Sequence, residues 1–71
     1  MNNVTITTEF IKLDSLLKFA NVVSSGGEAK NIILDELVLV NEGICTQRGK
    51  KIRKGDTITV LAPYDEVIVV D

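Results

Sequence analysis

The sequence contains no histidine and no tryptophan, and it has one cysteine among its 71 residues. Without histidine, a Ser-His or Cys-His nucleophile cannot be assembled, and Cys45 has no partners for a Cys/His zinc site or an internal disulfide. Cys45 lies in an apparent strand, and no part of the sequence indicates a low-pKa thiol. We therefore expect a buried or half-buried structural cysteine rather than a reactive one.

Other signatures of catalysis are missing as well. The sequence has no GxxxxGK[ST] or GxGxxG phosphate-binding loop. Its carboxylate pairs, at 35–36 and 65–66, are adjacent in sequence, which is not the facing geometry that acid-base catalysis or a two-metal site requires. We predict that the protein is not an enzyme and has no catalytic residues, no metal, no cofactor and no small-molecule substrate.

Aromatic residues are scarce: the chain has only Phe10, Phe19 and Tyr64. Readers of single-stranded RNA of the RRM or OB type stack bases on several aromatic side chains, so this composition argues against that class. We expect Phe10 and Phe19 to pack in the core.

Long apolar runs are also absent. The longest, such as "LVLV" and "VIVV", are far shorter than the ~20 residues that cross a bilayer. The start "MNNVTITTEF" lacks the basic and apolar regions of a signal peptide. We expect a cytoplasmic protein with no membrane partner. A composition of 45% hydrophobic and 25% charged residues fits one small folded domain over residues 1–71, which we expect to be a monomer.

The first half of the chain predicts one strand and two helices. In "VTITTEF", Val4, Ile6 and Phe10 lie on one side of a half-buried strand. "KLDSLLKFANVV" has leucines at helical spacing, and its Asp14 and Lys18 are predicted to form a surface pair.

The second helix is predicted to begin at Ser25, because Glu28 three residues later completes a capping box. Gly26 and Gly27 have two interpretations. They either permit a tight entry between closely packed helices, or they expose backbone N–H groups to a phosphate, with Lys30 one turn along. Glu28 argues partly against the phosphate, because its carboxylate would cap the same amides or repel the anion.

The second half of the chain alternates with a period of two. "LVLVNEGIC" predicts a hairpin with a turn at 41–43, and "DTITVLAP" and "DEVIVVD" predict two further strands. The order β-α-α-β-β-β predicts an α+β domain in which two helices pack on a small, mostly antiparallel sheet.

The segment "TQRGKKIRKGD" at 46–56 holds five of the eight basic residues: Arg48, Lys50, Lys51, Arg53 and Lys54. The net charge of the chain is −2, so the remainder carries three basic and ten acidic residues. The positive field is therefore local. It fits either a solvated turn between strands or a patch that binds phosphates.

Several motifs together resemble those of the ribosomal small-subunit protein four (S-four) type RNA-binding domain. They are "KLDSLLKF" at the first helix, "SSGGEAKNII" at the second, "VLVN" at a strand's end and a final Gly-Asp before another strand. "SGGEAK" and "RGKKIRKGD" further resemble the small stand-alone bacterial members of the YaaA and YbcJ type. The resemblance covers residues 8–60.

The resemblance implies an αL unit of two helices and a hairpin whose joint surface lies on folded RNA. By position, the RNA-binding residues that the resemblance implies are Lys12, Lys30, Arg48, Gly49, Lys50, Lys51 and Arg53. Lys54 joins this candidate set as part of the same basic run, and Gly26 and Gly27 are candidate backbone contacts at the start of the second helix. The chain departs from the family pattern where Gly26 replaces a common Arg, where Glu36 replaces a common Gly, and where "VNEG" replaces "VNG". The last two departures concern the local geometry around the hairpin.

These observations favour a non-catalytic protein that binds structured RNA through a basic face, with ribosomal RNA or an assembling ribosomal subunit as the partner the resemblance suggests. The alternative is a protein-interaction module. In that case the basic segment would dock an acidic partner, or "DEVIVVD" would serve as an edge strand that pairs with another chain.

Overall fold

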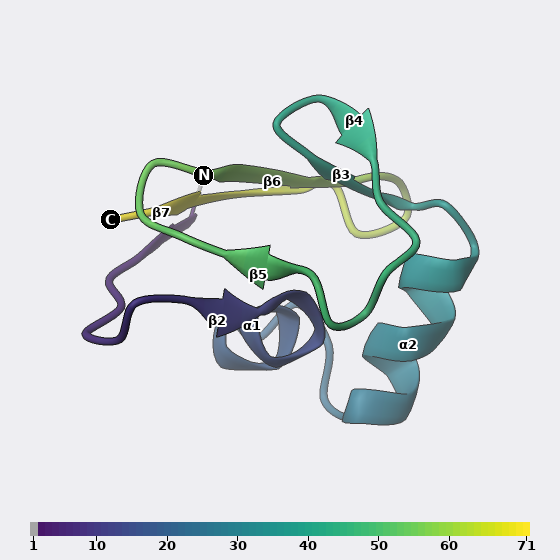
Figure 1. Cartoon of the computed structure of the whole chain (residues 1–71). Coiled ribbons are helices and arrows are strands. Elements are labelled where there is room, and N and C mark those ends of the chain that lie inside the picture. Colours follow the sequence, from purple (N-terminus) through teal and green to yellow (C-terminus); the bar gives the residue numbers. More distant parts are fainter. Residues whose placement is uncertain (1) are drawn as a thin grey trace.

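The computed structural model describes residues 2–71, in which two short helices pack against one face of a five-stranded sheet (Figure 1). The elements are β1 (Asn2–Val4), β2 (Ile11–Lys12), α1 (Leu13–Phe19), α2 (Gly26–Leu34), β3 (Val38–Val40), β4 (Gly43–Ile44), β5 (Lys51–Ile52), β6 (Thr57–Val60) and β7 (Glu66–Val70). The sheet order is β1-β7-β6-β3-β4, with β2 and β5 forming a separate two-stranded ladder. The predicted α+β class is confirmed, and β2 and β5 are additions to it. The first strand was expected in residues 4–10, but β1 covers Asn2–Val4 and the chain from 5 to 10 forms no strand.

One apolar core joins the helices to the sheet. The helices contribute residues at a spacing of three and four, which places them on one face, and the strands contribute every second residue. The fully buried members of this core are Leu13, Leu16, Leu17, Ala29, Ile33, Val38, Ile52, Ile58, Val60, Ile68 and Val70. Burying each large side chain stabilises the fold by about 1.5–3 kcal/mol. The helices and strands therefore take the positions that turn their apolar faces into this core.

The C-terminal strand lies inside the sheet. β7 pairs with β6 on one side in antiparallel register and with β1 on the other in parallel register, from Asn2 opposite Ile68 to Val4 opposite Val70. The backbone N–H of Asp71 also donates to the Val4 carbonyl at 2.8 Å. The suggestion that "DEVIVVD" offers an edge strand to a partner is therefore wrong.

Both helices end through a residue in the left-handed region. Asn21 at φ 60° follows α1, and the Val22 and Asn21 amides donate to the carbonyls of Leu17 and Lys18. This pattern is a Schellman motif, and it ends α1 at Phe19, earlier than the sequence pattern indicates. The same motif ends α2, where Glu36 has φ 62°.

Glu36 occupies a position that favours glycine, because a Cβ in the left-handed region costs roughly 1–2 kcal/mol. We expect Glu36→Gly to raise the free energy of unfolding by about 1 kcal/mol, measured by urea denaturation. Glycine also gains entropy in the unfolded chain, which opposes part of this effect. Glu36→Ala keeps the Cβ and serves as the control, with stability close to that of the wild type. A glycine variant less stable than the alanine variant would contradict this account.

The β3–β4 hairpin turns through Asn41 and Glu42, which both have positive φ, at 49° and 73°. Two such central residues define a type I′ turn, whose twist matches that of the flanking strands. The "VNEG" departure is therefore accommodated in a standard two-residue hairpin, as the turn predicted at 41–43 requires.

Candidate nucleic-acid interface

The basic loop, residues 46–56, is held against the start of α1. The first amides of a helix have no partner within the helix, and Lys12 at the N-cap provides no side-chain bond. The backbone carbonyls of Lys50 and Arg48 accept from the amides of Leu13 at 2.9 Å and Asp14 at 3.1 Å instead. The loop therefore caps α1, which fixes its cations relative to the helix.

Arg48 is directed to the protein's own carboxylate. Its Nε donates to Oδ2 of Asp14 at 3.1 Å, and Oδ1 of Asp14 accepts from the Ser15 amide at 2.8 Å. The predicted surface pair between Asp14 and Lys18 is wrong, because Asp14 uses its carboxylate on the basic loop. Arg48 therefore fastens the loop to α1 as well as adding charge to it.

Two lysines face each other in the β2–β5 ladder. Lys12 lies directly opposite Lys51 in antiparallel register, and both are exposed. Like charges placed opposite each other on two strands are destabilising. Fold stability therefore does not explain this pair, whereas a bound polyanion would.

The pair at Lys12 gives a prediction in which stability and binding change in opposite directions. Lys12→Glu places opposite charges across the ladder and an acid at the start of α1, which should raise the free energy of unfolding by about 0.5 kcal/mol. RNA affinity should fall roughly tenfold, because one phosphate contact becomes a repulsion.

Thermal denaturation and an RNA-binding titration measure the two effects, with Lys12→Gln expected to lie between the wild type and Lys12→Glu in both. A Lys12→Glu variant that lost stability would show that Lys12 serves the fold.

Phe10 contacts the cations of the loop. The Nζ of Lys51 lies 4.9 Å from the centre of its ring, and the Cζ of Arg53 lies 5.9 Å from it. The prediction that Phe10 and Phe19 belong to the core is wrong, because Phe10 is half-buried beneath these cations and Phe19, at the end of α1, is 64% exposed. Phe10 instead orders two flexible side chains through cation–π contacts.

A hydrogen-bond network joins the β3–β4 turn to the end of the basic loop. Oδ1 of Asp56 accepts from the side-chain amide of Asn41 at 3.0 Å, and Oδ2 accepts from the Arg53 backbone amide at 2.8 Å. The Oδ1 of Asn41 accepts from the Thr57 amide at 2.9 Å. The bond from the Arg53 amide is the main cause of a lowered pKa at Asp56, with Asn41 and the nearby Lys50 and Arg53 charges adding to it.

The turn at 53–56 also requires a glycine. Gly55 has φ 95°, a conformation that side chains with a Cβ rarely adopt, and its amide donates to the Val70 carbonyl at 2.8 Å. The Gly-Asp motif thus has a structural reason at both positions: Gly55 makes the turn and Asp56 ties it to the hairpin.

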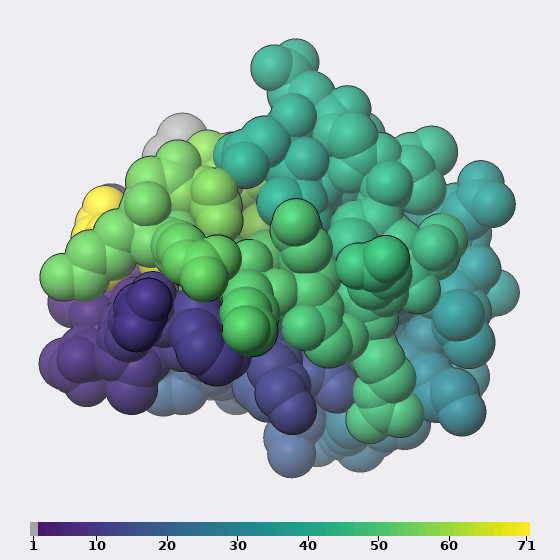
Figure 2. All heavy atoms as spheres, viewed as in Figure 1, coloured from purple at the N-terminus to yellow at the C-terminus, as the bar shows by residue number. Residues whose placement is uncertain are grey.

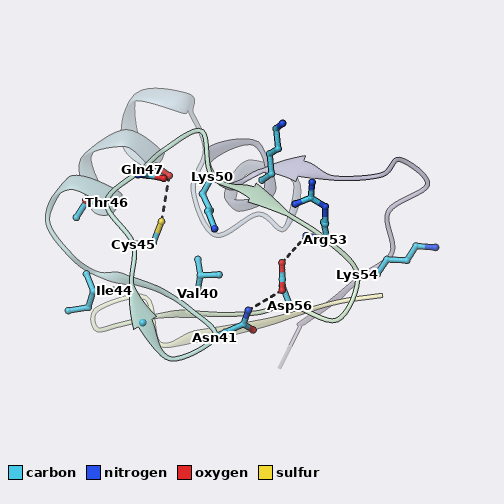
Figure 3. Close-up of a pocket in the computed structure, with 12 residues that line it drawn as sticks. Val40, Asn41, Ile44, Cys45, Thr46, Gln47, Lys50, Arg53, Lys54 and Asp56 are labelled. Carbon is cyan, nitrogen blue, oxygen red and sulfur yellow. Dashed lines mark hydrogen bonds between the residues drawn. The ribbon is translucent and has the colours of Figure 1, made fainter.

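An open hollow of about 740 Å³ lies between the β3–β4 hairpin and the basic loop (Figure 3). Four cations line it: Lys50, Lys51, Arg53 and Lys54. Its other lining residues are Val40, Asn41, Gly43, Ile44, Cys45, Thr46, Gln47 and Asp56. In the space-filling view, the green atoms of the basic loop lie beside the purple atoms of the segment that leads into α1 (Figure 2). We call the exposed surface formed by Lys12 and these four cations the basic face.

Cys45 is half-buried, as predicted, with its thiol 3.7 Å from the Gln47 carbonyl that accepts its hydrogen bond. Gly49 lies in the turn that the Lys50 amide closes on the Gln47 carbonyl at 3.1 Å, and a Cβ on Gly49 would meet no atom within 4 Å. The turn therefore does not require glycine at position 49.

The α2 candidates stand apart from this network. Lys30 is exposed on α2, and no hydrogen bond or ion pair described for residues 2–71 joins it to the basic loop. A Cβ on Gly26 would meet nothing within 4 Å, and one on Gly27 would meet only the Ser25 hydroxyl at 3.9 Å. The idea that these glycines permit tight helix packing is therefore wrong.

The start of α2 is instead closed by Glu28. The Ser25 hydroxyl accepts from the Glu28 amide at 3.2 Å, and Oε1 of Glu28 accepts from the amide of Ser24 at 3.1 Å. The hydroxyl of Tyr64 donates to Oε2 at 3.1 Å. The Ser24 bond is the main cause of a lowered pKa at Glu28, with Tyr64 contributing. The Glu28 carboxylate thus lies at the N-terminus of α2, where a phosphate would approach.

Over residues 2–71, no helix is long and apolar enough to cross a membrane. The same stretch contains no cluster of three or more Cys, Asp or Glu side chains that could hold a metal ion.

The sequence matches the S4 domain over residues 4–70, and the chain therefore belongs to the S4 domain family. The S-four type resemblance is thus confirmed. A relative at 41% identity is "Probable ribosome maturation protein RlbA" of Bacillus subtilis (strain 168). The similarity extends over 59 residues, which is 83% of this chain and 83% of the relative.

Proposed function

We propose that this chain is a non-catalytic, cytoplasmic protein that binds structured RNA through its basic face. The observation that carries the proposal is the pairing of Lys12 with Lys51 beside three further loop cations, since the fold gains nothing from placing like charges together. A polyanion would neutralise all five.

The basic face suits phosphates held in a fixed arrangement. The carbonyls of the loop cap α1, Phe10 orders Lys51 and Arg53, and Asp56 fixes the turn that follows. Cations held on such a scaffold contact the backbone of a folded RNA by position and supply little information about base sequence. The acidic remainder of the chain opposes wrapping by non-specific nucleic acid.

Ribosomal RNA or an assembling ribosomal subunit is the RNA we propose. The support is the S4 domain match together with the relative named as a probable ribosome maturation protein. Lys30 would extend the contact to α2. Gly26 and Gly27 would add backbone contacts only where a phosphate approaches without meeting the Glu28 carboxylate.

Copurification tests the proposal. The tagged protein, isolated from cells at low salt, should carry RNA that nuclease removes, and crosslinking followed by sequencing should recover ribosomal RNA positions. A stoichiometric acidic protein that remains bound after nuclease treatment would instead support docking of a protein on the basic loop.

A further inference from the structure

The hollow beside the basic loop has walls of two chemical kinds. The cations lie on the side of the basic loop, whereas half-buried Val40 and Cys45 lie on the side of the hairpin. Figure 3 shows the side chains of Val40 and Lys50 pointing toward the middle of the hollow from opposite sides, while the side chain of Ile44 points outward. Lys50 thus faces the apolar Val40 across the hollow, whereas the side chain of Lys54 points away from it (Figure 3) and the Nζ of Lys51 lies over the ring of Phe10.

A site for phosphate alone has no use for the apolar wall. A nucleotide has both features, because its base has apolar faces and its phosphate is an anion. The hollow of about 740 Å³ lies within the range of roughly 300–1,000 Å³ typical of ligand sites. The space and the chemistry of its walls fit one nucleotide.

The nucleotide must be unpaired. A base within an A-form helix is stacked between its neighbours, so the faces of that base are covered. The major-groove edge of the base lies in a deep, narrow groove that side chains cannot read. A paired base therefore cannot enter a hollow in a protein. A base in a bulge, loop or strand end can be turned out of the stack and placed against a protein surface.

We propose that this hollow receives one unpaired nucleotide of the bound RNA, with its base against Val40 and Cys45 and its phosphate on Lys50 opposite. This inference rests on the proposed function and adds to it a feature of the RNA that the protein selects. The hydrogen bond between Asn41 and Asp56 fixes the residues at one end of the hollow, and the hydrogen bond from the Cys45 thiol to the Gln47 carbonyl fixes those at another. Both ends are thus held in place before RNA binds.

Methyl and amide NMR on the labelled protein tests the inference with three probes: a short single-stranded oligoadenylate, a blunt-ended RNA duplex and inorganic phosphate. We expect oligoadenylate to shift the Val40 methyl signals and the Cys45 amide, and the other two probes to shift only signals of the loop lysines. Oligoadenylate that leaves Val40 unmoved, or a duplex that moves it equally, would overturn the inference. Polyglutamate that shifts Val40 as strongly would assign the hollow to an acidic protein and overturn it as well.

Two variants provide an independent readout. Val40→Thr keeps the shape of the side chain and replaces one methyl group with a hydroxyl, so oligoadenylate should bind about fivefold more weakly. Cys45→Ser should act in the same direction, and duplex binding should change less than twofold in both. Val67→Thr is the matched control, because Val67 pairs with Thr59 and alternates with buried Ile68, which places it on the other face of the sheet.

Failure of this inference can be told apart from failure of the proposed function. If duplex RNA still binds through the loop lysines but Val40→Thr and Cys45→Ser bind oligoadenylate as the wild type does, the hollow is not a nucleotide site and the basic face stands. If none of the RNA probes shifts any signal of the basic loop, both proposals fail.

Discussion

Replacing Lys50, Lys51, Arg53 and Lys54 together with glutamine should weaken RNA binding roughly 100- to 1,000-fold near physiological salt. Each cation that neutralises a phosphate releases condensed counterions, and the free energy of that release is lost when the charge is removed. These four side chains are exposed and line one hollow, so a folded RNA can meet them at once. Glutamine keeps most of the length of each side chain. The measurement is a binding titration with fragments of ribosomal RNA.

A smaller pair of variants separates the basic face from net charge. Lys50→Gln/Lys51→Gln removes two charges from the face, and Lys18→Glu changes the net charge of −2 by the same two units on the polar side of α1. The double variant should lose about tenfold or more in affinity, whereas Lys18→Glu should lose at most a few-fold. Equal losses would show that RNA responds to overall charge and not to this surface.

Asp56→Asn should lower the free energy of unfolding at neutral pH by about 2 kcal/mol, since hydrogen bonds to a charged carboxylate contribute about 1.5–3 kcal/mol. The carboxylate accepts from the Arg53 amide and from Asn41, and the substituted amide would turn a donor toward one of these donors. The loop and the hairpin would then separate more readily. Urea denaturation of both proteins at pH 7 measures the difference.

The pH dependence of this deficit has a definite sign. The pKa of Asp56 is lowered in the folded state, chiefly by the Arg53 amide. Its stabilising effect is therefore fully present above the pKa of the unfolded chain and is lost as the pH falls through the lower folded value. The deficit of Asp56→Asn should stay constant from pH 7 to about 5 and shrink below about pH 4. A deficit of the same size at pH 3 would mean that the charge of Asp56 is not what stabilises the turn.

Local sequence patterns determine much of this fold, and the sequence alone predicts the elements that depend on them. The helix start at Ser25 and the alternation in β6 and β7 depend on neighbours within a few residues, and both predictions are confirmed. The capping box is confirmed only in its first bond, because the Glu28 carboxylate accepts from the Ser24 amide instead of the Ser25 amide. The ends of α1 and α2 were less clear, because Asn21 and Glu36 adopt left-handed conformations that the hydrogen bonds of a Schellman motif impose.

The sequence alone does not predict contacts between distant parts of the chain. Asp14 lies 34 residues from Arg48, so the sequence suggested its near neighbour Lys18 instead. β7 becomes an inner strand only because β1, from the other end of the chain, pairs with it. Asn41 and Asp56 each belong to a motif that the sequence shows, but they are 15 residues apart in the chain. The hydrogen bond between them depends on the fold that brings the hairpin against the loop, and the sequence alone does not predict it.

The salt dependence of RNA binding tests the central claim most directly. If the basic face neutralises about four to six phosphates, log K plotted against log salt should have a slope of about −3 to −5 for the wild type. The slope for the variant that lacks Lys50, Lys51, Arg53 and Lys54 should be about −1. An unchanged slope in the variant would remove these cations from the RNA interface and contradict the account.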